Sequence, residues 1–571
     1  MSTLPERPWL TSYAAGVPAD VEVPNQSLVD LLDESSRRFG PRPALDFFGA
    51  TTSYAELQTA VARAAEALRR LGVQAGDRVA LVLPNCPQHV VAFYAVLRLG
   101  AIVVEHNPLY TPQELQHQLA DHGAEVAVVW DKAARVLQQI AADTSVRTVV
   151  SVDMTTALPR LKRWLLRVPM PSARRTRTAM TAPAPGTLQW EKLLAAAEPI
   201  DPTYPRPSSE DVAVLQYTGG TTGTPKGAIL SHRNLLANAI QGRAWVPGLR
   251  AGEETIYAIL PIFHAYGLTL CLTFAISIGA TLVLFPRFDV DQVLAAMKRR
   301  PVTFLPAVPP VYQRLAAAAK ERGVDLSSAR YGISGAMALP PETATLWEEV
   351  TGGLLAEGYG MTEASPVAVG NPISTARRIG TVGLPFPSTE ARVVDPENPD
   401  QDREPGASGE LLLRGPQVFS GYWRQPEETA KVLLPDGWLR TGDIVEMDRD
   451  GFIRVVDRIK ELIITGGFNV YPSEVEDALR RVPGVVDAAA VGLPTAGGEE
   501  VVAAVVLAEG ADTSESAIRE ASRQHLAAYK VPRRVVVVDE LPRSQIGKVL
   551  RRQVRESLLS QPGGGQQNQS S

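Results

Sequence analysis

A glycine- and threonine-rich stretch, Tyr217–Gly227, constrains the fold and chemistry of this chain more than any other feature. Its glycines let the backbone adopt positive φ and approach an anion closely. Successive backbone N–H groups and threonine hydroxyls supply donors for phosphate oxygens, and Lys226 adds a mobile positive charge. The stretch predicts a phosphate-binding loop; a solvated surface loop is the alternative.

This loop differs from the phosphate loop of P-loop NTPases. That motif needs a Ser or Thr directly after its Lys, so that a hydroxyl reaches magnesium from the start of a helix. Here Lys226 is followed by Gly227 and Ala228. The sequence therefore excludes the P-loop type and predicts another way of holding phosphate.

Length and composition indicate a globular protein of several domains. The chain has 571 residues, more than one hydrophobic core normally spans, with 45% hydrophobic and 21% charged residues. The net charge of -5 gives no electrostatic basis for nucleic-acid binding, so we expect no such partner. Cys86 and Cys271 stand far apart in apolar stretches, which predicts buried thiols and a reducing, cytoplasmic compartment.

Two features bear on membrane insertion. The N-terminus has no apolar signal core, so we expect no signal peptide. The uncharged stretch 255–286 is long enough to cross a bilayer, but Pro261, His264, Gly267 and Gly279 interrupt it. It is better explained as part of the core, so we expect no transmembrane helix.

A basic segment, Leu158–Arg177, holds seven Lys and Arg residues and no acidic residue, with Trp164 and other apolar side chains among them. Basic residues interleaved with apolar ones predict contact with an anionic membrane surface. The alternative is a solvated insertion between two sheet units. Three prolines favour that alternative, because proline cuts a helix short.

The first two thirds of the chain alternate helical patterns with short apolar strands, which predicts parallel sheets covered on both faces. These patterns cover 54–71, 78–84, 87–99, 101–104, 281–285, 290–299 and 302–305. From about residue 383, short strands divided by Gly, Pro and Asp predict a small antiparallel β-barrel or sheet. After Arg458 comes a compact α+β pattern with helices expected at 472–481 and 515–527.

The predicted fold class is therefore α/β. Residues 1–457 form a large domain of two parallel-sheet α/β subdomains plus the small β subdomain at about 383–457. Residues 458–559 form a separate C-terminal α+β domain. The low-complexity tail 560–571 is expected to be disordered.

Further motifs carry chemistry. Glu357–Glu363 places an aromatic ring, a hydroxyl and two carboxylates around two glycines. The ring suits a stacked purine, the hydroxyl suits an α-phosphate and a carboxylate suits Mg²⁺, although an ordinary glycine-rich turn competes with this interpretation. Asp443 ends a Thr-Gly-Asp motif and could accept from both ribose hydroxyls. Arg458 and Lys548 lie further along the chain.

Together these motifs resemble those of the adenylate-forming enzymes, which include acyl- and aryl-CoA synthetases, peptide-synthetase adenylation domains and luciferases. They occur in the family's order over about two thirds of the chain. Within the family the chain is most similar to bacterial long-chain fatty-acid–CoA ligases. The segments that carry this likeness are 383–390, 409–411, 415–419, 436–460, 467–476 and 529–532.

The resemblance implies an enzyme with two half-reactions, which uses ATP, Mg²⁺ and coenzyme A. A fatty carboxylate attacks the α-phosphorus of ATP to give acyl-AMP and diphosphate, and the thiol of coenzyme A then displaces AMP. The alternatives are a fatty-acyl-AMP ligase, a medium-chain or aryl-acid CoA ligase, and a non-catalytic lipid-uptake or membrane-docking protein. Chain-length preference and oligomeric state, a homo-oligomer included, stay open.

The resemblance also implies site residues. Lys548 would bridge the substrate carboxylate and the α-phosphate, with Thr362 and Glu363 as further catalytic residues. Glu363 and Thr218 would position Mg²⁺, and His264 would line the acyl pocket unless it is a core histidine. The nucleotide site would comprise Thr218, Gly219, Gly220, Thr221, Thr222, Gly223, Thr224, Lys226, Ser334, Gly335, Ala336, Glu357, Gly358, Tyr359, Gly360, Thr362, Asp443, Arg458 and Lys548.

Within that set, Tyr359 would stack on adenine, and Asp443 with Arg458 would hold the ribose. The family rotates its C-terminal domain, and Lys460 matches the hinge position. The residues expected to border the coenzyme A tunnel are Gly466, Gly467 and Phe468. Two departures stand out: the late motif has Arg-Ser at 543–544 where the family commonly has Lys-Thr, and position 466 is Gly where relatives often carry Lys.

Overall fold

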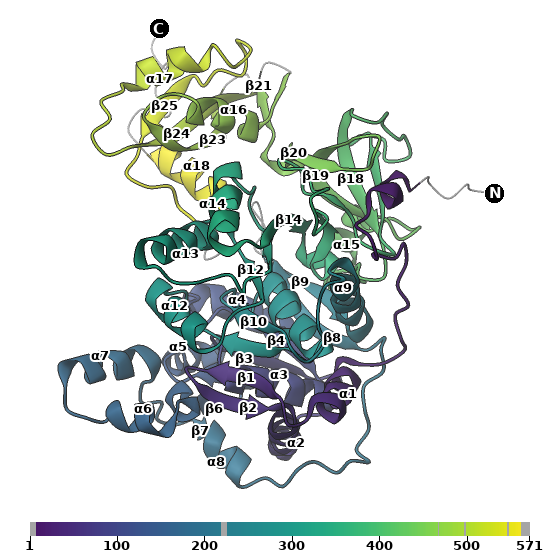
Figure 1. Ribbon diagram of the computed structural model, residues 1–571, viewed down its shortest axis with the longest axis vertical. Coiled ribbons are helices and arrows are strands. Elements are labelled where there is room, and N and C mark those ends of the chain that lie inside the picture. The colour runs from purple at the N-terminus through teal and green to yellow at the C-terminus, as the bar shows by residue number, and fades with distance from the viewer. Residues whose placement is uncertain (1–6, 219–224, 466–467, 496–497, 545–546, 561–571) are drawn as a thin grey trace. The chain divides into compact units, whose positions relative to one another are not determined.

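The computed structural model describes residues 7–218, 225–465, 468–495, 498–544 and 547–560 (Figure 1). The described chain divides into two compact units. The first contains residues up to 390 together with 413–439, and the second contains 391–412 and 440–560. The division groups the small β region with the C-terminal region, whereas the boundary at 457/458 stays a prediction.

The first unit contains a seven-stranded sheet. Its strands, in spatial order, are β7 (Leu188–Gln189), β6 (Thr148–Val152), β5 (Val126–Trp130), β3 (Arg78–Val82), β4 (Ile102–Glu105), β8 (Val212–Thr218) and β9 (Lys226–Ser231). All neighbours pair in parallel except β8 and β9, which are antiparallel. The expected strands at 78–84 and 101–104 are therefore confirmed as β3 and β4.

A nine-stranded sheet completes the first unit. Its strands, in spatial order, are β16 (Leu384–Pro385), β15 (Val367–Gly370), β14 (Leu354–Gly360), β13 (Tyr331–Ser334), β12 (Phe304–Ala307), β10 (Thr255–Ala258), β11 (Thr281–Leu284), β1 (Pro43–Phe47) and β2 (Ala50–Ser53). The six inner strands pair in parallel, and antiparallel strands lie at both edges. The expectation of parallel sheets holds for the interiors, but apolar pattern alone does not reveal direction at the edges.

Helices connect these strands, as the alternating pattern predicts. Those of the first unit are α1 (Leu28–Phe39), α2 (Tyr54–Arg70), α3 (Pro87–Arg98), α4 (Pro112–His122), α5 (Ala134–Ile140), α6 (Arg160–Leu165), α7 (Pro171–Met180), α8 (Trp190–Ala195), α9 (His232–Trp245), α10 (Ala265–Gly267), α11 (Phe274–Ser277), α12 (Val290–Arg299), α13 (Pro309–Arg322), α14 (Pro341–Thr351) and α15 (Pro426–Val432). Side-chain capping explains several starts: Ser53 begins α2 by accepting from the Glu56 amide, and Glu56 bonds back.

The uncharged stretch 255–286 is buried in the first unit as several short elements. It runs from β10 through α10, a π-helical turn at Leu268–Thr273, and α11 to β11. Within the described ranges no helix combines the length and apolarity that crossing a bilayer needs. Cys86 and Cys271 are buried free thiols, and burial raises the pKa of Cys86 to about 12.

The small β region is a four-stranded sheet of β17 (Glu390–Val394), β18 (Ser408–Arg414), β19 (Leu439–Met447) and β20 (Ile453–Arg458), in that order. The C-terminal part of the second unit has a hairpin of β21 (Ile463–Thr465) and β22 (Phe468–Val470). Its three-stranded sheet consists of β23 (Val485–Thr495), β24 (Gly498–Leu507) and β25 (Arg534–Val537). The α/β class with a smaller C-terminal α+β region is therefore confirmed.

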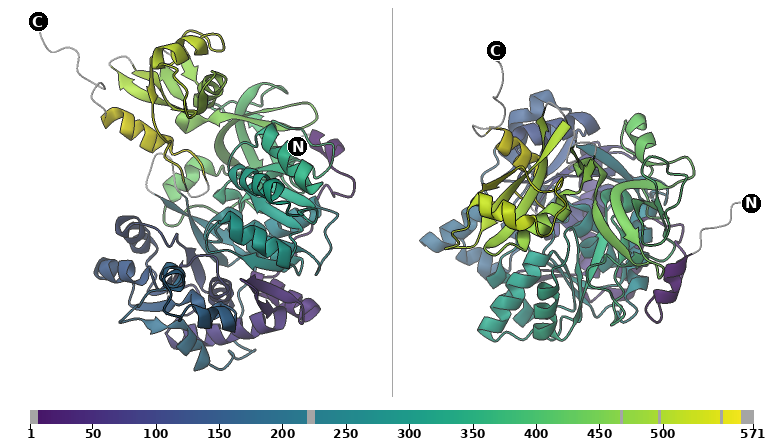
Figure 2. Two further views of the ribbon diagram at one scale, coloured as in Figure 1. Left: turned by 60° about the vertical axis from the view of Figure 1, so that its left-hand side comes forward. Right: turned by 90° about the horizontal axis from the view of Figure 1, so that it is seen from above.

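Helices α16 (Pro472–Arg480), α17 (Glu515–Ser522) and α18 (Arg551–Ser560) cover the three-stranded sheet (Figure 2). Successive residues of a strand face opposite sides. Accordingly Ala488 and Ala490 belong to the apolar cluster with α16 and α17, whereas Ala489 and Val491 belong to the cluster with α18. Helix α17 ends earlier than the expected 515–527, because the next amides bond carbonyls three residues back. Residues 561–571 of the expected tail lie outside the described ranges.

Candidate active site

The two ends of the predicted phosphate loop are adjacent in space. Thr218 ends β8, Lys226 begins β9, and the antiparallel register pairs these two residues directly. Residues Gly219, Gly220, Thr221, Thr222, Gly223 and Thr224 lie outside the described ranges. The register therefore places the backbones of Thr218 and Lys226 side by side at the ends of the two paired strands.

Lys226 has two partners from a segment that the sequence motifs did not identify. Its ammonium group forms an ion pair with Glu428 of α15. Its Nζ also lies 5.1 Å from the ring centroid of Tyr422, within cation–π range. Hydrogen bonds from Lys226 and then Lys431 lower the pKa of Glu428 to about 2, so Glu428 is a carboxylate at neutral pH.

Glu363, the predicted magnesium ligand, is connected to the same segment. It lies in a short 3₁₀ turn, Thr362–Ala364, and is 7% exposed. The Tyr422 hydroxyl donates to Glu363 Oε1 at 2.6 Å, and the Phe419 amide donates to the Glu363 carbonyl at 2.9 Å. Burial and the neighbouring Glu363 carboxylate raise the pKa of Tyr422, which keeps its hydroxyl protonated as a donor.

The segment 419–423 follows β9 along its length. The Ile229 amide donates to the Gly421 carbonyl at 2.9 Å, and the Trp423 amide donates to the Gly227 carbonyl at 2.8 Å. Asn234 of α9 holds the preceding turn by donating to the carbonyls of Pro416 and Val418. We call residues 419–423 the strap, because they connect the strand of Lys226 with the turn of Glu363.

The predicted adenine pocket forms on adjacent parallel strands. Ser334 at the end of β13 pairs with Glu357 of β14, which continues through Gly358, Tyr359 and Gly360. Gly335 and Ala336 follow β13, and Ala336 has a φ of 66°. The Ser334 hydroxyl is buried and has no hydrogen-bond partner among the described residues. Burial raises the pKa of Glu357 to about 8, so this carboxyl group is mostly protonated at neutral pH.

Two glycines of this region let their own backbone lie very close to neighbouring residues. A Cβ on Gly360 would lie 2.0 Å from the carbonyl oxygen of Pro366, and one on Gly335 would lie 3.1 Å from the ring of Tyr266. Side chains larger than hydrogen therefore do not fit at Gly360, and at Gly335 they force Tyr266 to move. The glycines expected to serve the nucleotide thus also have a packing role.

His264 lies at the N-terminus of α10, where its Nδ1 accepts a 3.4 Å hydrogen bond from the Tyr266 amide. Burial lowers the pKa of His264 to about 4, so the imidazole is neutral at physiological pH. The contact fits a structural role, and the core-histidine interpretation also stays a prediction because His264 is only half-buried. Its role in an acyl pocket stays a prediction.

An apolar pocket lies beside β14 in the first unit. Its lining residues are Gly242, Trp245, Val246, Leu270, Phe274, Phe304, Ile333, Gly358, Val367, Gly370 and Phe386. The lining includes Gly358 from the predicted adenine strand and residues from the stretches 268–285 and 302–312. Trp245 stacks on Phe386 with ring centroids 4.8 Å apart and donates to the Asn371 carbonyl, which fixes one wall.

The second unit brings together the predicted ribose and adenylation residues. Asp443 and Arg458 are paired across β19 and β20, with Arg458 Nε 2.9 Å from Asp443 Oδ1. Burial, and then the charge of Arg458, lowers the pKa of Lys548 to about 8, while Glu461 and Asp443 oppose this shift. Lys548 is therefore closer to losing its proton at neutral pH than an ordinary lysine.

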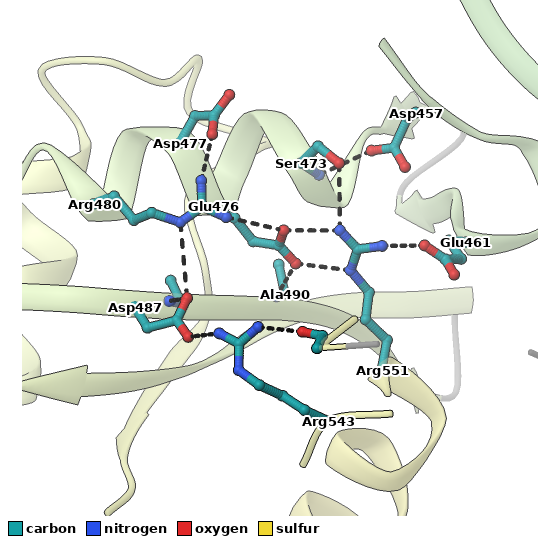
Figure 3. Close-up of polar contacts among 12 residues, drawn as sticks. Asp457, Glu461, Ser473, Glu476, Asp477, Arg480, Asp487, Ala490, Arg543 and Arg551 are labelled. Atoms are coloured by element: carbon teal, nitrogen blue, oxygen red, sulfur yellow. Dashed lines mark hydrogen bonds and ion pairs between the residues drawn. The ribbon is translucent and has the colours of Figure 1, made fainter. Parts of the chain in front are cut away.

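Figure 3 shows the ion-pair network that holds the start of α18, three residues after Lys548. Arg551 contacts both carboxylate oxygens of Glu476 at 2.8 Å, forms an ion pair with Glu461 and donates to Ser473. Asp457 accepts from the Ser473 amide at 2.8 Å. Because Glu461 follows the predicted hinge residue Lys460, the network links the hinge region to the helix that follows Lys548.

The structure tests neither the predicted hinge residue nor the three predicted coenzyme A residues. Gly466 and Gly467 lie outside the described residues, and for Lys460 and Phe468 only the backbone is described, in Ile459–Glu461 and β22. Within the described ranges no group of three His, Cys, Asp or Glu side chains could hold a metal ion. One buried carboxylate, Glu363, nevertheless suits Mg²⁺, which proteins usually bind through one or two carboxylates plus substrate phosphates.

The fold is that of a mixed α/β protein with a smaller C-terminal α+β region. The profile of the AMP-binding enzyme family matches residues 32–423, and that of the AMP-binding enzyme C-terminal domain matches 474–548. The chain belongs to the AMP-binding enzyme family.

Three known proteins illustrate the likeness. The long-chain-fatty-acid–CoA ligase of Bacillus subtilis is 38% identical over 562 residues, which cover 96% of this chain and 98% of that protein. The feruloyl-CoA synthase of an Amycolatopsis species is 36% identical over 89% of this chain and 94% of that protein. The crystal structure of ATP-bound MatB from Rhodopseudomonas palustris superposes with a TM-score of 0.80 at 31% identity, covering 94% and 99% of the two chains.

Proposed function

We propose that this chain is a long-chain fatty-acid–CoA ligase, which converts a fatty acid, ATP and coenzyme A into acyl-CoA, AMP and diphosphate through an acyl-adenylate. The observation that carries the proposal is the strap, which ties Lys226 and Glu363 together through Tyr422. A cation beside the phosphates and a carboxylate that can hold a metal ion are groups that reactions at the phosphorus atoms of ATP use. The 38% identity to a long-chain-fatty-acid–CoA ligase supports the substrate class.

The first half-reaction crowds negative oxygens around the α-phosphorus, so positive groups must be oriented there in advance. Lys226 and the loop 218–224 would hold the β- and γ-phosphates. Glu363 and Thr218 would hold Mg²⁺, whose chemistry when bound is to neutralise charge on phosphate oxygens. Thr362 would donate to the α-phosphate.

The remaining nucleotide contacts follow from the strand ends. Tyr359 would stack on adenine, and the Ser334 hydroxyl, which has no hydrogen-bond partner among the described residues, would meet the edge of the base or the ribose. Asp443 would accept from the ribose hydroxyls, with Arg458 orienting its carboxylate across the sheet. Lys548 would bridge the fatty carboxylate and the α-phosphate, which brings nucleophile and electrophile together.

The acyl chain would enter at the apolar pocket between α9, the π-helical turn and β14, which would have to widen, because it now has room for about one water molecule. Its lining residues present no charged group, and burying each methylene contributes about 0.8 kcal/mol. In the second half-reaction the C-terminal domain, 458–559, would rotate about Lys460, so that Gly466, Gly467 and Phe468 border the coenzyme A tunnel. The two buried free thiols fit a reducing, cytoplasmic location.

The test is an acid ladder from hexanoate to eicosanoate, with ferulate added, given to the purified protein with ATP, Mg²⁺ and coenzyme A. We expect acyl-CoA, AMP and diphosphate in equal amounts, with the highest kcat/KM for long chains. A preference for ferulate would mean that the substrates are aryl acids and not long-chain fatty acids; ferulate is included because one relative is a feruloyl-CoA synthase. Acyl-AMP without acyl-CoA would identify an acyl-AMP ligase instead.

A further inference from the structure

The basic segment forms two short helices, α6 and α7, which project from the edge of the first unit (Figure 1). We call residues 158–180 the basic hairpin. Pro159 caps α6 and Pro171 occupies the first turn of α7, so these prolines begin helices rather than prevent them. No residue of either helix is buried. Apart from Leu158 at its start, which is buried, the hairpin is thus an ordered surface feature whose side chains lie outside the core.

Large apolar side chains are concentrated on this hairpin. Leu161 is 68% exposed, Trp164 62%, Met170 53% and Leu165 46%. These are four of the twelve large hydrophobic side chains that are exposed among the described residues, within a stretch of ten positions. Single exposed apolar residues need no explanation, but such a concentration marks an interaction surface. A simple solvated insertion would have polar residues here.

The charge of the hairpin indicates what covers those side chains. Its seven cations are Arg160, Lys162, Arg163, Arg167, Arg174, Arg175 and Arg177. None of them forms an ion pair in the part of the chain that the structure describes, and residues 158–180 include no acid. This positive charge lies in a chain whose net charge is -5. Cations around an aromatic and aliphatic centre match the headgroup region of an anionic bilayer.

The hairpin is also fixed to the body of the protein at both helices. Lys162 of α6 donates to the Phe48 carbonyl at 2.9 Å. At the end of α7, Trp130 Nε1 donates to the Met180 carbonyl at 2.8 Å, and Lys132 donates to the Thr178 carbonyl at 2.9 Å. A surface that is already ordered loses less conformational entropy on binding than a flexible loop.

We propose that residues 158–180 are a docking surface for a membrane that contains anionic phospholipids. Trp164, Leu161, Leu165 and Met170 enter the headgroup region, and the arginines contact lipid phosphates. The proposal goes beyond the proposed function, because it concerns where the chain binds rather than the reaction. Docking would bring an acyl-activating site to the bilayer, where long-chain acids accumulate.

The test uses the full chain in a vesicle flotation assay. We expect binding to vesicles of phosphatidylcholine with phosphatidylglycerol, weakening with salt, and little binding to phosphatidylcholine alone. The variant Arg174→Gln/Arg175→Gln/Arg177→Gln should bind about tenfold or more weakly, since each cation near the surface contributes separately. Trp164→Ser/Leu165→Ser should also reduce binding.

The matched control is Arg243→Gln/Arg250→Gln/Arg449→Gln, which removes three exposed cations elsewhere. It should bind vesicles as the unaltered chain does. All variants should keep their melting temperature and their activity on a water-soluble short-chain acid. Equal binding to neutral and anionic vesicles, or unchanged binding of the hairpin variants, would overturn the proposal. If the hairpin variants differed from the unaltered chain in oligomeric mass but bound vesicles equally well, the proposal would fail and the surface would serve self-association.

Discussion

The Tyr422 hydroxyl donates a 2.6 Å hydrogen bond to Glu363, while the ring of the same tyrosine lies against the ammonium group of Lys226. One side chain therefore orients both the proposed metal ligand and the proposed phosphate cation. The backbone pairs between the strap and β9 fix the position of that side chain. Neither Tyr422 nor the strap carries a group that would react.

Replacing Tyr422 by Phe tests this coupling, because the ring stays and only the donor is lost. Hydrogen bonds to charged groups contribute about 1.5–3 kcal/mol, so we expect binding of ATP with Mg²⁺ to weaken about tenfold or more. Binding of ATP in EDTA should change much less. Calorimetric titration with and without Mg²⁺ measures both.

The control for Tyr422→Phe is Tyr257→Phe, which also removes a buried hydroxyl, one that donates to the Arg300 carbonyl at 2.7 Å. It should lower stability without changing the magnesium dependence of ATP binding. An equal loss of affinity with and without Mg²⁺ in Tyr422→Phe would show that the tyrosine does not act through Glu363.

Glu428→Gln should have the opposite effect on ATP binding. Glu428 is paired with Lys226, and ATP must compete with that carboxylate for the ammonium group. Solvent screens such an exposed ion pair, so removing the carboxylate should tighten ATP binding only about two- to fivefold. Glu427→Gln removes the same charge one residue earlier on an exposed side chain and should have little effect. Weaker ATP binding in Glu428→Gln would mean that Glu428 orients Lys226.

Lys548 should make the first half-reaction sensitive to alkaline pH. Burial lowers its pKa to about 8, so the ammonium group is present below that pH and is lost as the pH rises through it. We expect the rate of acyl-AMP formation to fall above about pH 8, and Lys548→Ala to abolish that step. Thioester formation from supplied acyl-AMP should be affected much less. Equal losses in both half-reactions would refute the adenylation role.

Local signals in the sequence were enough for much of the fold. The helices at 54–71 and 87–99 appear as α2 and α3, because apolar spacing and capping are local properties. Sequence patterns do not reveal the link from Tyr422 to Glu363, since it depends on the strap pairing with β9 nearly two hundred positions earlier. The antiparallel sheet edges were missed for the same reason: strand direction follows from chain connections, not from composition.

A substitution at the proposed hinge residue Lys460 should impair the second half-reaction and spare the first, which is the reverse of the effect expected for Lys548→Ala. Lys460→Pro fixes φ at that position, so the C-terminal domain could not swing between two states. If that φ suits the adenylation state, diphosphate release should continue while acyl-CoA production falls much further. Measuring both products from one reaction tests this. If diphosphate release and acyl-CoA production fell equally in a variant that remains folded, the hinge and the 457/458 boundary would have to lie elsewhere in the chain.

Gly242 should limit the length of the acyl chain that the apolar pocket accepts. It lies on α9, lines the pocket, and a Cβ there would contact the Phe274 ring at 3.4 Å. The Cβ of a Gly242→Val variant therefore meets only the Phe274 ring, and the two methyl groups beyond it would take up pocket space. Burying a methylene contributes about 0.8 kcal/mol, so kcat/KM should fall about fourfold for each methylene excluded. Octanoate should be affected less than palmitate.

The matched control is Ala244→Val, which adds a β-branched side chain to the same helix at a position that does not line the pocket. It should lower activity on palmitate and octanoate to the same small extent, because both substrates depend equally on the stability of α9. The decisive measurement is the ratio of kcat/KM for the two acids in each variant. If Gly242→Val left that ratio unchanged, the acyl chain would lie outside this pocket, and the lining aromatic residues would only pack the core.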